Sequence, residues 1–128
     1  MKKAMIIILS ILGVLLLMGA GGIFYITNGL QAGENLAITP VDLTEIEDGT
    51  YTGVYQAGRW ANEVAVSVAD HQITNIDVVK TVTIESPEMT STIINRVIEK
   101  QNTTVDTVSG ATVTSKAYLK AIENALSQ

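Results

Sequence analysis

The strongest hydrophobic pattern of the chain lies in its first 27 residues. Residues 4–27 carry no charge, and as a helix they would be about 36 Å long, enough to cross a hydrocarbon core of about 30 Å. Lys2 and Lys3 precede this stretch, so the positive-inside rule places the N-terminus in the cytoplasm and the remainder outside. The pattern predicts a transmembrane anchor at residues 1–27, single-pass in the cell membrane, with an extracytoplasmic C-terminal domain.

A cleaved signal peptide is the alternative interpretation of the same stretch. Ala20-Gly21-Gly22 has the small residues of a cleavage site. The apolar run is longer than the core of a usual signal peptide, which favours the uncleaved anchor. Both interpretations export the rest of the chain.

The next segment, residues 28–46, has no sustained hydrophobic period. Gly29, Gly33 and Pro40 interrupt it, which predicts a linker that lifts a domain off the bilayer. A short strand near Leu36–Ile38 is an alternative for its middle part.

A domain begins near residue 47, and its first part shows the patterns of β-strands. The segment 50–56 is rich in β-branched and aromatic residues, and its Gly53 indicates a bulge or a close approach of another element. Asp70-His71 predicts a tight turn between a second and a third strand, with His71 exposed. The inward-facing residues of these two strands are Val64, Val66 and Val68, then Ile73, Ile76 and Val78, with a phase that extends toward Val82 and Ile84.

Two helical patterns follow. Ser86-Pro87-Glu88 is a helix start, with Ser86 as N-cap, and Asn102-Thr103-Thr104 ends that helix. The last helix is expected over 114–126, with Lys116, Lys120, Glu123 and Asn124 facing water. The predicted fold class is therefore α+β: an N-terminal transmembrane helix, then a small antiparallel sheet packed with two helices in one domain, residues 47–128. The apolar stripes of the two helices are Met89, Ile93, Ile94, Val97 and Ile98, and Ala117, Tyr118, Ala121, Ile122, Ala125 and Leu126.

Composition and charge exclude several functions. The chain has no Cys, which rules out disulfides, thiolate zinc sites and Cys-ligated iron–sulfur clusters, and its single His argues against a His-based metal site. The net charge of −5 argues against nucleic acid as a partner. If the protein does redox chemistry, its cofactor must be organic.

The stretch with the most chemistry is residues 106–115, DTVSGATVTS. Gly110 permits a tight turn, Ala111 leaves space beside the next hydroxyl, and Thr114 and Ser115 are N-cap residue types for the last helix. Thr112 is thus expected on an exposed bend just before a helix N-terminus, a place that favours a phosphate group. A polar turn that only caps a helix is the simpler interpretation of the same residues.

This stretch resembles the covalent flavin attachment motif of the FMN-binding domain family, which includes flavin-bearing subunits of sodium-pumping quinone reductases and Rnf complexes. Asp106, Ser109, Gly110 and Ala111 match its fixed positions, and the resemblance makes Thr112 the acceptor of a phosphoester to FMN. The segment 48–53, DGTYTG, is similar to the start of the same family's first strand.

The resemblance implies further roles. Asp106 would position the acceptor or a metal ion in a transferase complex, Ser109 would fix the turn, and backbone N–H groups over 110–115, including those of Thr114 and Ser115, would bind the phosphate. Candidates to stack on the flavin ring are Tyr51, Tyr55 and Trp60. The family also has a flavin-contacting Thr in the region of Thr81 and Thr83, but here no His stands beside either.

The implied function is electron transfer by an extracytoplasmic, membrane-anchored flavoprotein. Its partners would be a flavin transferase for maturation, a membrane electron donor, an extracytoplasmic acceptor and the lipid bilayer. The chain resembles an electron carrier more than a complete oxidoreductase. A non-covalent FMN carrier or sensor, and a cofactor-free membrane-tethered interaction module, are the alternatives.

Overall fold

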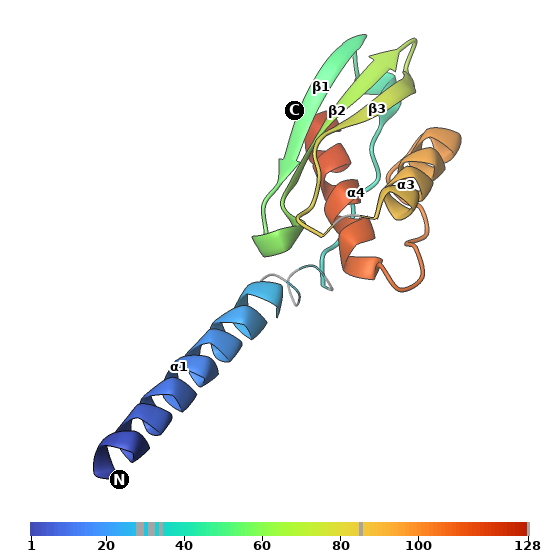
Figure 1. Ribbon diagram of the computed structural model, residues 1–128. Coiled ribbons are helices and arrows are strands. Elements are labelled where there is room, and N and C mark those ends of the chain that lie inside the picture. The colour runs from blue at the N-terminus through green and yellow to red at the C-terminus, as the bar shows by residue number, and fades with distance from the viewer. Residues whose placement is uncertain (28–29, 31–32, 34, 85, 128) are drawn as a thin grey trace.

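The computed structural model describes residues 1–27, 30, 33, 35–84 and 86–127. In these ranges a long N-terminal helix is followed by a three-stranded sheet and two further helices, as the sequence predicts (Figure 1). The elements are α1 (Lys2–Thr27), η1 (Leu43–Glu45), β1 (Gly49–Tyr55), η2 (Gly58–Trp60), β2 (Asn62–Ala69), β3 (Gln72–Lys80), α3 (Pro87–Lys100) and α4 (Thr112–Leu126).

Helix α1 projects away from the rest of the molecule and has no buried residue (Figure 1). It is long and apolar enough to cross a membrane, by length and composition. The helix thus has the extent and the apolar character that the predicted anchor requires.

The sheet is an antiparallel meander in the order β1-β2-β3. On the central strand β2, Val64, Val66 and Val68 are buried while the residues between them are partly exposed, which confirms the predicted alternation. The β2–β3 turn has Asp70 and His71 at φ 53° and 60°, the left-handed pair that a two-residue hairpin requires. His71 is exposed, as expected.

The third strand ends earlier than its apolar phase predicts. β3 stops at Lys80, and Ile84 is exposed. Val82 is buried outside any strand, where its N–H donates to the Tyr118 hydroxyl at 3.3 Å. The Val82 side chain is thus buried, as the alternation predicts, although its backbone lies beyond the end of β3.

Gly53 is the point where α4 crosses β1. A Cβ at this position would lie 1.9 Å from the carbonyl oxygen of Ala121 and 2.5 Å from the backbone nitrogen of Ala125. The predicted close approach is therefore the packing of a helix backbone directly onto the strand.

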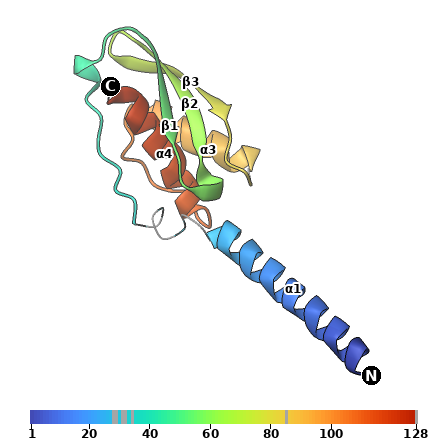
Figure 2. The same cartoon turned by 90° about the vertical axis from the view of Figure 1, so that its left-hand side faces the viewer.

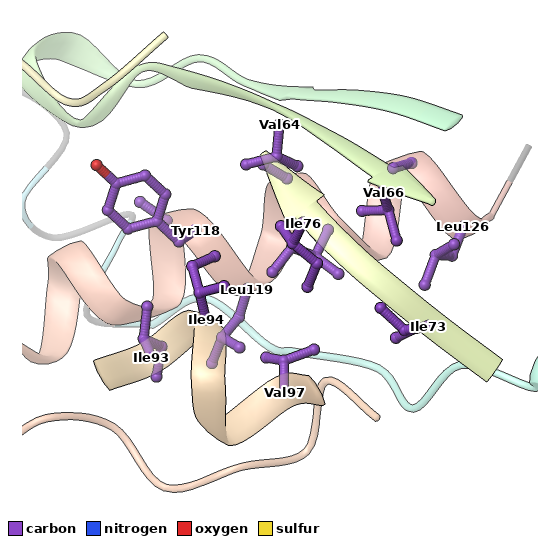
Figure 3. Packing of buried hydrophobic residues seen from close by; sticks show 14 of the residues in the cluster. Val64, Val66, Ile73, Ile76, Ile93, Ile94, Val97, Tyr118, Leu119 and Leu126 are labelled. Atoms are coloured by element: carbon purple, nitrogen blue, oxygen red, sulfur yellow. The ribbon is translucent and has the colours of Figure 1, made fainter. Parts of the chain in front are cut away.

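The core lies between the sheet and the two helices. Figure 3 shows Val64, Val66, Ile73 and Ile76 from β2 and β3 facing side chains of α3 and α4. Burying such side chains contributes about 1.5–3 kcal/mol each relative to exposure. The predicted apolar stripe of α4 is buried throughout, and Leu119 joins it.

Glu123 corrects the predicted polar face of α4. It is 5% exposed instead of facing water, since residues 38–46, the N-terminal strap, pack against the core and place Thr39 against its carboxylate. Its carboxylate accepts a hydrogen bond from the Thr39 N–H and pairs with Lys120. Burial raises the pKa of Glu123, but the hydrogen bonds from Lys120 and Thr39 outweigh burial and hold the pKa below its ordinary value.

The N-terminal strap has contacts that a free linker would lack. The Asn102 side chain pairs with both backbone groups of Val41 at 3.2 Å, and the Thr103 hydroxyl donates to the Thr39 carbonyl at 2.7 Å. Residues 36–38, for which a strand was an alternative, form none. Of the predicted linker 28–46, residues 28–29, 31–32 and 34 lie outside the described ranges.

Candidate functional site

The turn before α4 is shaped by one glycine. The Ala111 N–H donates to the Val108 carbonyl at 2.9 Å, which closes the turn over 108–111, the glycine turn. Gly110 has φ +79°, and a Cβ there would meet nothing within 4 Å. The backbone conformation, and not space, is therefore what selects glycine here.

Helix α4 begins two residues earlier than predicted. Ala111 is its N-cap and makes no side-chain cap, and Thr112 is its first helical residue. The expectation that Thr114 and Ser115 cap the helix is wrong, because Ser115 already lies inside the first turn: its N–H donates to the Ala111 carbonyl at 2.9 Å. Without a side-chain acceptor at the N-cap, this helix end suits an anion.

Ser115 instead holds the glycine turn from within. Its fully buried hydroxyl donates to the Ala111 carbonyl at 2.7 Å and accepts from the Val108 N–H at 3.1 Å. Both ends of the turn are thus bound by one side chain. This contact is the reason that the turn conformation is fixed while Ser109, Gly110 and Thr112 remain exposed.

Two grooves lie beside the glycine turn. The first, the Thr112 groove, has a volume of ≈ 410 Å³ and is the one that Thr112 lines. The second, the Ile84 groove, has a volume of ≈ 480 Å³ and reaches from the turn to the start of α3. The Thr112 groove is lined by Leu30, Arg59, Trp60, Gly110, Ala111, Thr112, Val113 and Thr114; the Ile84 groove is lined by Arg59, Ile84, Ser86, Glu88, Met89, Thr92, Val108, Ser109, Gly110, Ala111 and Thr114.

Arg59 lines both grooves, and sequence reasoning missed it. Its guanidinium lies 4.1 Å from the centroid of the Trp60 ring, and its carbonyl accepts from the Thr83 N–H at 2.9 Å. The available signal was a single cation beside a tryptophan in a loop that also contains Gly58. Only the folded chain places that loop next to the glycine turn.

A comparison with protein families identifies the domain. The model of the FMN-binding domain matches residues 59–127, more than half of the chain. The chain belongs to the FMN-binding domain family. A comparison with curated proteins gives no match.

FMN is therefore the cofactor of this domain, and the residues beside the glycine turn fit it. The uncapped N-terminus of α4 and the Arg59 guanidinium suit the FMN phosphate. Ile84, Met89 and Val108 give the Ile84 groove an apolar wall that suits an aromatic ring system. Ser86, the predicted N-cap of α3, makes no side-chain cap and lines this groove with its hydroxyl available.

Asp106 lines a different groove from the other residues of the predicted attachment motif. It lines a third groove of ≈ 450 Å³ with Arg96, Glu99, Lys100 and Val105, and Thr112 is not among the lining residues. The Arg96 guanidinium donates to the backbone carbonyl of Asp106 at 2.9 Å and not to its side chain. Asp106 itself is exposed. Within the described residues, the structure brings Ser109, Gly110, Ala111, Thr112 and Thr114 together and places Asp106 outside their grooves.

Of the three aromatic residues predicted to stack on FMN, Trp60 alone lines a groove beside the glycine turn in the part of the chain described. It is 2% exposed, and Arg59 covers one face of its ring. The Tyr51 hydroxyl donates to the Glu47 carbonyl at 2.6 Å, in a pocket formed with Leu126. Burial raises the pKa of Tyr55, and this side chain packs against the core. Thr81 and Thr83 are exposed and line neither groove.

Proposed function

We propose that this protein carries FMN through a phosphoester to the Thr112 hydroxyl and transfers electrons outside the cytoplasm while α1 holds it in the membrane. The observation that carries the proposal is the position of Thr112. It is exposed, it is the first residue of an uncapped 15-residue helix, and it opens onto a groove beside a glycine turn. The DxxSGAT pattern of residues 106–112 supplies the chemical identity of the acceptor.

Attachment would proceed by phosphoryl transfer from FAD. The Thr112 oxygen forms a bond to the FMN phosphorus, the phosphoanhydride bond of FAD breaks, AMP leaves and the hydroxyl proton is lost to solvent or to a base of the transferase. Thr112 is exposed, so an external enzyme has access to it. The exposed Asp106 carboxylate, in its separate groove, suits recognition by that transferase or a metal ion in its complex.

After attachment, residues of this chain would hold the group. The backbone N–H groups in the first turn of α4 would bind the phosphate, and Arg59 would supply a positive charge. Ile84, Met89 and Val108 of the Ile84 groove would give the ring an apolar contact surface and partly exclude water from it. Bound FMN supplies one- or two-electron transfer, and the protein sets its position and surroundings.

The same proposal includes the orientation of α1 in the membrane and the redox partners of the domain. Lys2 and Lys3 hold the N-terminus in the cytoplasm, which places the domain outside. A membrane electron donor reduces the FMN and an extracytoplasmic acceptor oxidises it. The protein then acts as a carrier between them.

Intact mass after co-expression with a flavin transferase tests the attachment. The wild type should gain the mass of one FMN less one water and stay yellow after denaturation, whereas Thr112→Ala should gain nothing. Thr114→Ala is the matched control, because Thr114 is a second threonine beside the same grooves and should leave the added mass unchanged. Equal masses for wild type and Thr112→Ala, apart from the substitution, would refute the phosphoester; yellow colour lost on denaturation would indicate non-covalent binding.

A further inference from the structure

Arg59 is held in place on several sides. It lies in η2, between β1 and β2, where its guanidinium stacks on the buried Trp60 ring at 4.1 Å. Its carbonyl accepts from the Thr83 N–H at 2.9 Å, so the backbone is fixed as well. Stacking on a buried ring already restricts the rotamers of the arginine. A further contact by the same side chain therefore costs less conformational entropy.

That further contact is to the end of α1. The Arg59 Nε donates to the Ile26 carbonyl at 3.0 Å. Ile26 lies in the last turn of α1, where the helix dipole favours a positive charge. Arg59 thus binds the C-terminal end of the apolar helix from the domain side.

The same side chain lines both grooves beside the glycine turn. One arginine therefore separates the end of α1 from the groove that contains Thr112. Both views of the molecule show α1 meeting the domain at the end where α4 begins, with the β2–β3 turn at the opposite end (Figure 1, Figure 2). A helix of 26 residues is about 39 Å long, so with its apolar part in a bilayer its last turn lies at the level of the lipid headgroups.

We propose that Arg59 locks the end of α1 onto the FMN site, so that the glycine turn and its flavin are held against the lipid headgroups instead of moving freely on a tether. This proposal rests on the proposed function for the flavin and for the orientation of α1. Arg59 acts as a positioning residue, and the partner of this face is the bilayer surface. A donor confined to the membrane surface can then reach the flavin without movement of the domain.

Quenching of flavin fluorescence by a headgroup label tests the proposal. The full chain, flavinylated in the cell, is placed in phosphatidylcholine vesicles with a fraction of lipid that carries a spin label on its headgroup. The wild type should be strongly quenched. Arg59→Gln should lose most of the quenching, because loss of a charged hydrogen bond and a ring contact should shift the ratio of docked to undocked domains about tenfold. Arg59→Lys, which keeps the charge, should restore part of it.

Two further variants separate docking from folding and from bulk charge. A flexible Gly-Ser segment inserted after Thr27 leaves Arg59 and the domain unchanged, and it should lose as much quenching as Arg59→Gln. Lys80→Gln removes an exposed positive charge at the end of β3 and should be quenched like the wild type. Equal quenching of wild type, Arg59→Gln and the insertion variant would overturn the proposal.

Failure of the proposed function would give a different result. If the wild type retains no flavin, a fluorophore takes its place on Ser109→Cys, which would be the only thiol of the chain and lies on the exposed glycine turn. Quenching of this fluorophore that depends on Arg59 supports the docked geometry without a flavin. Absence of that dependence overturns the docked geometry.

Discussion

Helix α4 begins at Thr112 in an exposed turn without a side-chain cap, whereas its C-terminal half is enclosed by β1 on one side and by the N-terminal strap on the other. At the closed end the Asn124 side chain donates to the Val54 carbonyl at 2.9 Å, and the Glu123 carboxylate accepts from Thr39. The comparison teaches that one helix both packs into the core along its length and presents, at its exposed first residue, the proposed attachment site.

The largest effect should come from Gly53→Ala at the closed end. The new Cβ would lie 1.9 Å from the Ala121 carbonyl oxygen, so α4 must move away from β1. We expect a loss of at least about 3 kcal/mol in the free energy of unfolding, measured by denaturant titration. Gly110→Ala is the control at the open end: it meets no atom within 4 Å but has φ +79°, and it should cost about 1–2 kcal/mol. Equal losses for the two variants would contradict the difference between the ends.

Removing the buried carboxylate should have the next largest effect. Glu123→Ala leaves the Thr39 N–H and Lys120 without their acceptor, and we expect a loss of about 1–3 kcal/mol in the free energy of unfolding. Glu99→Ala, on the exposed face of α3, should change it by about 0.5 kcal/mol or less. A loss no larger than that of Glu99→Ala would show that the N-terminal strap does not depend on Glu123.

The same carboxylate should make stability depend on pH. Its pKa in the folded state lies below the ordinary value of 4.5, so unfolding takes up a proton at acid pH. The stabilisation is therefore complete above about pH 4.5 and is lost as the pH falls below it through the folded-state pKa. Denaturant midpoints measured from neutral to acid pH should fall less steeply in Glu123→Gln than in the wild type. Parallel profiles would assign the acid sensitivity to other groups.

The smallest effect should come from adding the missing cap. Ala111→Ser gives α4 a hydroxyl at its N-cap and should raise the free energy of unfolding of the flavin-free protein by about 1 kcal/mol. The new hydroxyl would occupy N–H groups that we propose hold the FMN phosphate, so the yield of flavinylated protein should fall, as measured by intact mass. A more stable variant with an undiminished yield would argue that these N–H groups do not hold the phosphate.

Local sequence patterns predicted most of the packing around the C-terminal half of α4 and less of the structure around the glycine turn. The alternation of Val64, Val66 and Val68 and the apolar stripe of α4 report burial directly, because packing repeats with the period of each element. Glu123 was misplaced because the strap that covers it is distant in sequence and has no periodic signal. Thr114 and Ser115 misled the cap assignment since Ser115 bonds backward to the turn from inside the helix, which residue type alone does not indicate. Arg59 required the tertiary fold to bring η2 beside the glycine turn.

The buried Ser115 hydroxyl determines how much of the chain must be transferred if the motif is to be built into another protein. It lies three positions beyond Thr112, the proposed acceptor, yet it bonds both ends of the turn that precedes Thr112. Residues 106–112 grafted into another protein would keep the motif but lack the Ser115 hydroxyl that fixes the turn. A graft that preserves the turn conformation must include residues 106–115 and be placed at the start of a helix.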